Sequence, residues 1–124
     1  MKTFLALIVI GVMTHISSDL MTQKTKVVKL EQVPGEFKTK ELKLAAGRPY
    51  VFEVKNDGVD HEVGFVITPK GKEQDQNSHV TESYLSKTIK NGEKAESGTV
   101  TLSKGEYVYF CPLNPTPSYT LIVE

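Results

Sequence analysis

Short stretches of alternating apolar and polar residues follow one another along most of the chain, and this period-two pattern constrains the fold most. In one stretch Tyr50, Phe52 and Val54 share a face, while Val51 and Glu53 lie on the other. Successive side chains of a strand point to opposite faces, so such a stretch can bury one face and leave the other in water. Turn-forming residues recur about every eight to twelve positions. The pattern predicts an all-β domain, a Greek-key β-sandwich or barrel of about seven to eight strands.

Two stretches depart from simple alternation. Residues 107–111 are apolar on both faces, which predicts a strand at the centre of its sheet. Residues 70–86 are polar and weakly patterned, and Ser78 is expected to cap a short helix there. The residues expected to turn from that helix toward the sandwich are Val80, Tyr84 and Leu85.

The first residues have the layout of a secretory signal. Lys2 precedes an apolar run over residues 4–13, which is too short to cross a bilayer because a spanning helix needs about 20 apolar residues. We therefore expect a cleaved signal over residues 1–18 and a folded domain over residues 25–124. A buried N-terminal strand and an uncleaved membrane anchor are the alternatives. With a cleaved signal, the domain is exported, periplasmic or secreted, and is not inserted in the membrane.

Charge and motifs exclude several classes of function. Fifteen Lys and Arg residues balance fifteen Asp and Glu residues, so the chain lacks the one-sided positive field that nucleic acids and anionic lipids select. We expect no nucleic-acid partner. His61 and Glu62 begin an H-E-x-x-H pattern, but Phe65 stands where the second His of a zinc protease would be. The sequence also has no Gly-rich phosphate loop and no C-x-x-C motif, and we expect no enzymatic activity.

The only cysteine of the chain is Cys111, so no intramolecular disulfide can form. In an exported protein an unpaired thiol is open to oxidation unless it is buried or bound to a ligand. Cys111 therefore calls for a buried position or a bound group.

Three segments of the sequence together resemble the cupredoxins, the small blue copper proteins. Residues 47–56 resemble the strand of that family that runs into a loop beginning with Asn. Residues 56–65 are similar to the segment that carries the first copper-ligating His, which here is His61. Residues 105–112 resemble the family's G-x-Y-x-Y-x-C-P segment. The cysteine of that segment is the thiolate ligand. The order and spacing of the segments fit over the whole expected domain, so the resemblance implies a cupredoxin-like sandwich.

The resemblance implies a copper site with an incomplete set of ligands. A blue copper centre holds its ion with two imidazoles, a thiolate and a weak axial donor, and in the family the second His and the Met follow the Cys within one short loop. In this chain Asn114 stands at the position of the second His, and Pro117 or Tyr119 stands near that of the Met. Beyond the expected signal the only histidines are His61 and His79, and His79, in the polar stretch, is expected at the surface.

Two hypotheses of function remain. In the first, Cys111 and His61 bind copper, with Asn114, a backbone carbonyl or a side chain of a partner protein as a weak third donor. The domain would then transfer electrons or carry copper, and its partner would be a redox protein or a copper-delivery protein. In the second, the sandwich is a copper-free interaction module. His61 is then an exposed loop residue and Cys111 a small buried hydrophobe.

Overall fold

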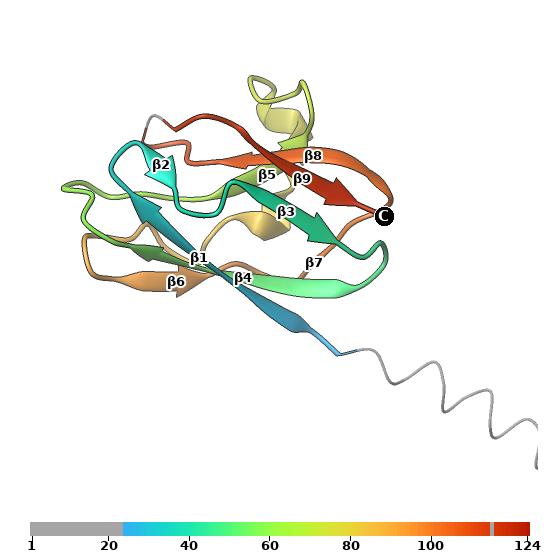
Figure 1. Cartoon of the computed structure of the whole chain (residues 1–124), viewed down its shortest axis with the longest axis horizontal. Coiled ribbons are helices and arrows are strands. Elements are labelled where there is room, and N and C mark those ends of the chain that lie inside the picture. Colours follow the sequence, from blue (N-terminus) through green and yellow to red (C-terminus); the bar gives the residue numbers. More distant parts are fainter. Residues whose placement is uncertain (1–23, 115) are drawn as a thin grey trace, which may run out of the picture.

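The computed structural model describes residues 24–114 and 116–124, in which two β-sheets face each other as a sandwich (Figure 1). The first sheet contains β1 (Lys26–Val33), β2 (Glu36–Phe37), β4 (Pro49–Asn56), β6 (Lys94–Glu96) and β7 (Val100–Thr101). The second sheet contains β3 (Glu41–Leu44), β5 (Val66–Pro69), β8 (Gly105–Phe110) and β9 (Tyr119–Val123). Two single-turn 3-10 helices, η1 (Gln76–Ser78) and η2 (Thr81–Ser83), follow β5. In the described part of the chain, no helix is long and apolar enough to cross a membrane.

The strand order brings distant parts of the sequence together. β1 pairs in parallel with β4 in the first sheet, and β3 pairs in parallel with β9 in the second. β8 lies between β9 and β5 and is antiparallel to both, so the prediction of a central strand there is confirmed. The predicted β-sandwich is also confirmed. It has nine strands among the described residues, and two of them, β2 and β7, have only two residues each.

The core lies between the sheets and is rich in aromatic side chains. Alternation along β4 buries Tyr50, Phe52 and Val54, as the sequence predicts. Phe65 occupies the middle of the core, with its ring centroid 5.3 Å from that of Phe52 and 6.0 Å from that of Tyr109. Burial raises the pKa of Tyr109 above its ordinary value. The Tyr109 hydroxyl therefore stays protonated.

The polar stretch after β5 differs from the prediction in its caps. Asp75, not Ser78, caps η1: its carboxylate accepts hydrogen bonds from Asn77 N at 3.1 Å and from Ser78 Oγ at 2.8 Å. The Ser78 hydroxyl is thus used as a donor to the cap. Val80 and Leu85 pack against the core as expected, but Tyr84 is 41% exposed. Each 3-10 helix has a single turn, which is too short to present one continuous apolar face.

Candidate metal site

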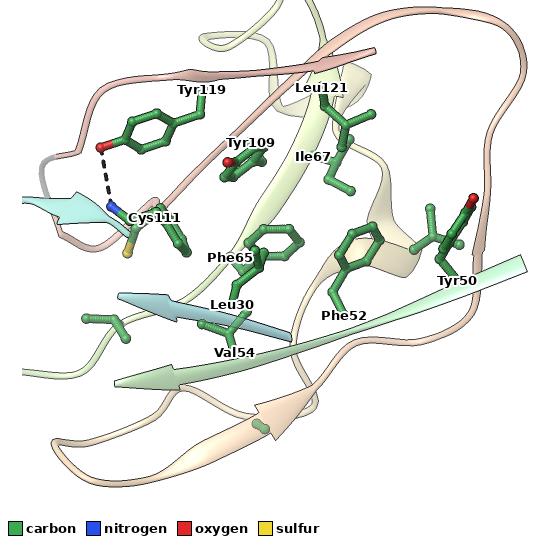
Figure 2. Close-up of a cluster of buried hydrophobic side chains, with 14 of the residues drawn as sticks. Leu30, Tyr50, Phe52, Val54, Phe65, Ile67, Tyr109, Cys111, Tyr119 and Leu121 are labelled. Carbon is green, nitrogen blue, oxygen red and sulfur yellow. Dashed lines mark hydrogen bonds between the residues drawn. The ribbon is translucent and has the colours of Figure 1, made fainter. Parts of the chain in front are cut away.

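Cys111 directly follows the central strand β8, at the end of the core where the chain leaves the sheet. Figure 2 shows its sulfur at one end of the buried aromatic cluster, and the residue is 5% exposed. The backbone N–H of Cys111 donates to Thr116 Oγ1 at 3.1 Å, which fastens the loop that follows. On the outer side, Gly64, Pro112 and Leu113 line an apolar groove at the surface. The thiol is therefore held in a defined place and screened from bulk water.

Three backbone N–H groups donate hydrogen bonds to the Cys111 sulfur. They belong to Asn114 at 3.1 Å, Gly64 at 3.3 Å and Leu113 at 3.4 Å. Gly64 lies in the segment that carries His61, so two of the segments that resemble a copper protein meet at this sulfur. Hydrogen bonds of this kind stabilise negative charge on sulfur and tune metal-bound thiolates. The surroundings of Cys111 thus suit a thiolate ligand.

His61 lies in the loop that follows β4, and buried Asn56 organises this loop. The Asn56 side chain accepts a hydrogen bond from Val59 N at 2.9 Å and donates to the carbonyls of His61 and Ile89, each at 3.1 Å. The imidazole of His61 is 48% exposed, and its Nδ1 lies 3.1 Å from Asp60 Oδ1. A carboxylate on one ring nitrogen orients the ring and makes the other nitrogen a better metal ligand.

Asn114, at the position of the second imidazole, is buried and hydrogen-bonded through its side chain. It is 5% exposed, and its Nδ2 donates to Oε1 of Gln32 at 2.8 Å. Gln32 comes from β1 in the opposite sheet and in turn donates from Nε2 to the carbonyl of Gly64 at 3.3 Å. A chain of neutral amides therefore links the two loops that surround the sulfur.

Sequence reasoning missed Gln32, although a signal for it exists. Gln32 stands two positions after buried Leu30 on β1, and Asn56 stands two positions after buried Val54 on the neighbouring β4. Since residues two apart share a face of a strand, both amides continue the inward row. They are direct neighbours in the register of the sheet. Two inward-facing polar residues near the C-terminal ends of paired strands indicate a buried polar site there.

The structure brings the predicted site residues together only in part. Asn114 contacts the sulfur of Cys111 through its N–H and lines one small hollow with His61 and Asp60. His79 is not part of this group, because its Nδ1 lies 2.8 Å from Tyr84 Oη and its ring packs edge-on against Phe110. Of the described residues, no three or more His, Cys, Asp and Glu side chains gather as they would around a metal ion.

Neither residue near the expected Met position carries a thioether. Tyr119 is buried in the core, where its hydroxyl accepts a hydrogen bond from Phe37 N at 3.3 Å (Figure 2). Pro117 is exposed. The described side chains therefore offer no thioether, and the second imidazole, that of His79, is bonded to Tyr84 and packs against Phe110.

Comparison with known proteins identifies the family. Residues 3–123 match the family model of the cupredoxin-like domain. The chain belongs to the cupredoxin-like family. Among solved structures, this cupredoxin-like chain is similar to auracyanin A, a "blue" copper protein from the green thermophilic photosynthetic bacterium Chloroflexus aurantiacus, with a TM-score of 0.67 and 15% identity. That similarity covers 82% of this chain and 100% of auracyanin A.

Two further solved structures have the same fold. The reduced auracyanin of the photosynthetic bacterium Roseiflexus castenholzii has a TM-score of 0.61 and 16% identity, over 80% of this chain and 97% of its own. The azurin Az-iso2 of the obligate methylotroph Methylomonas sp. strain J has a TM-score of 0.60 and 14% identity, over 80% of this chain and 98% of its own. No curated protein sequence matches significantly. At these identities the similarity establishes the fold of the cupredoxin-like domain, and its metal chemistry must be argued from its own residues.

The donor groups of this cupredoxin-like domain fit copper in one oxidation state better than in the other. A blue Cu(II) centre requires two imidazoles beside the thiolate. In this chain the carboxamide of Asn114, which is already bonded to Gln32, stands at the position of the second imidazole. A single thiolate with a single imidazole is a soft set of low coordination number, which suits Cu(I). The described residues therefore do not form an ordinary blue centre, and an ion shared by Cys111 and His61 would be held as Cu(I).

Proposed function

We propose that this chain is an exported cupredoxin that holds one copper ion, chiefly as Cu(I), and passes an electron or the ion itself to a protein partner. The observation that carries the proposal is the environment of the Cys111 sulfur. The sulfur is buried at the end of the central strand and accepts hydrogen bonds from the backbone N–H groups of Gly64, Leu113 and Asn114. A cysteine that served only as a small core hydrophobe would need no such set of donors.

Three groups would hold the ion. The Cys111 sulfur and the imidazole of His61 are the two strong donors, and Asn114, which lines a hollow with His61, is the weak third. Bound copper supplies a one-electron couple, or is itself the cargo. The chain's own residues provide the rest: the N–H groups balance the charge of the sulfur, the core excludes water from it, and half-exposed His61 offers an edge that a partner can reach.

Export is part of the same proposal. The expected signal over residues 1–18 lies outside the described residues, while β1 begins at Lys26, close to the expected start of the domain. A lone thiol at the sulfur site is protected from oxidation by burial and by a bound ion. We expect the mature protein recovered from the expressing cells to lack residues 1–18, which N-terminal sequencing can check.

The function is tested by competition between the purified protein and a chromogenic Cu(I) chelator. We expect the protein to withdraw one equivalent of Cu(I). His61→Asn should weaken the affinity by at least about tenfold, because it removes one of two strong donors. His79→Asn is the matched control and should bind as the wild type does, because His79 packs against Tyr84 and Phe110. Equal affinities for wild type and His61→Asn would contradict the assignment of His61.

One observation favours a copper-free interaction module as the second candidate. The Asn114 amide is committed to Gln32 at 2.8 Å, so the position of the second imidazole is filled by a satisfied neutral pair. In that case the wild-type protein would withdraw no Cu(I) from the chelator, and the same titration decides between the two functions.

A further inference from the structure

Gln32 joins the two loops that meet at the Cys111 sulfur. It is 0% exposed, and both ends of its amide are used: Oε1 accepts from Asn114 Nδ2 at 2.8 Å, and Nε2 donates to the Gly64 carbonyl at 3.3 Å. A buried amide costs free energy unless it is hydrogen-bonded. The position of Gln32 therefore depends on Gly64 and Asn114, and theirs depends on Gln32.

The two partners of the Gln32 side chain are also two of the three donors to the sulfur. Gly64 N lies 3.3 Å and Asn114 N lies 3.1 Å from Cys111 Sγ. Each of these residues thus bonds Gln32 through one polar group and the sulfur through its backbone N–H. Networks of this kind strengthen their members mutually in a low-dielectric interior.

We propose that Gln32 is a positioning residue that aims the N–H groups of Gly64 and Asn114 at the Cys111 sulfur and keeps the two loops closed over it. Gln32 stands on β1 of one sheet, whereas Cys111 and Asn114 follow β8 of the other. The hydrogen bond between Gln32 and Asn114 therefore also links the two sheets at this end. The effect on the free thiol is independent of any metal, and only its consequence for copper affinity rests on the proposed function.

The test is the rate at which iodoacetamide alkylates Cys111 in the metal-free protein. The sulfur is buried, so the reaction requires local opening of the loops. Gln32→Met keeps the length of the side chain and removes both hydrogen bonds. We expect alkylation to become about tenfold faster, since losing a buried hydrogen bond changes an opening equilibrium by roughly that factor. In NMR spectra the amide protons of Gly64 and Asn114 should shift, because their bonds to sulfur loosen.

Ser83→Ala is the matched control for a general loss of stability. Ser83 is equally buried, and its hydroxyl bonds Ile67 N at 2.8 Å and the Val80 carbonyl at 2.6 Å. The Ser83 side chain makes no hydrogen bond to Gln32, Gly64 or Asn114, which surround the Cys111 sulfur. We expect Ser83→Ala to leave both the alkylation rate and the two amide shifts close to those of the wild type. Equal acceleration in Ser83→Ala and Gln32→Met would overturn the proposal.

A second variant covers the case in which Gln32→Met does not fold. Asn114→Ala removes the same 2.8 Å bond from its other end and keeps the backbone N–H. It should also accelerate alkylation in the metal-free protein, because Gln32 then loses the hydrogen bond that ties it to the loop after β8. An unchanged alkylation rate in Asn114→Ala would overturn the role of Gln32.

The same alkylation measured after Cu(I) is added separates this proposal from the copper function. If Cu(I) does not slow alkylation of the wild-type Cys111, the copper function is overturned and the Gln32 proposal still stands.

Discussion

Replacing Cys111 by serine is expected to reduce the affinity for Cu(I) by at least about 100-fold, the upper end of what one supporting contact costs in metal sites. The thiolate is the only soft donor that the described residues place at this end of the sandwich, and Cu(I) prefers sulfur over a hydroxyl oxygen. Serine is close to cysteine in size, and its oxygen can accept the same N–H groups of Gly64 and Asn114. We therefore expect the fold to survive.

Chelator competition measures the loss of affinity, and thermal unfolding of the metal-free proteins checks the fold. The expected pattern is a similar unfolding temperature for wild type and Cys111→Ser, with Cu(I) raising it only in the wild type, since a ligand stabilises the state that binds it. Wild-type affinity in Cys111→Ser would place copper on other groups and would refute the assignment of the thiolate.

The second large effect concerns stability. Phe65→Ala is expected to lower the free energy of unfolding by about 3–5 kcal/mol, a large fraction of the roughly 5–15 kcal/mol that holds a domain of this size. The Phe65 ring packs against those of Phe37, Phe52 and Tyr109, with centroids 5.3–6.0 Å away. Removing it leaves a cavity at the contact of the two sheets. The chain has no disulfide that could offset the loss.

Denaturant unfolding followed by circular dichroism measures this change. Val27→Ala is the control, because Val27 is a large apolar residue that is half exposed at the start of β1, and it should change the free energy of unfolding by no more than about 0.5 kcal/mol. A loss below about 1 kcal/mol for Phe65→Ala would mean that the neighbouring rings refill the space and that Phe65 does not hold the core together.

The fold was predictable from the sequence because alternation and burial agree along the strands. On β4 the inward row of Tyr50, Phe52 and Val54 is apolar without a break, and one register satisfies it. The polar stretch after β5 was predicted less well. Asp75 caps η1 and also takes the hydrogen bond of the Ser78 hydroxyl, whereas local propensity ranks Asp and Ser as similar N-caps and does not choose between the two positions.

The sequence could propose candidate site residues where they match family segments, but not where the site depends on packing across the sheets. The motifs propose Cys111 and His61, and its place in the loop proposes Asn114; the metal-binding role of all three stays a prediction. Gln32 is separated from Asn114 by 82 positions in the sequence, and it forms part of the site only because the sandwich brings the end of β1 against the loop after β8. A contact of this kind follows from tertiary structure, and alternation gives only the weaker hint that Gln32 points inward.

X-ray absorption at the copper edge of the Cu(I)-loaded protein shows whether the Cys111 sulfur binds the ion. We expect a first coordination shell with one sulfur and one or two nitrogen or oxygen donors, and we expect the sulfur contribution to disappear in Cys111→Ser. A shell made only of nitrogen and oxygen in the wild-type protein would contradict this expectation, because copper would then be held away from the Cys111 sulfur that the three N–H groups surround.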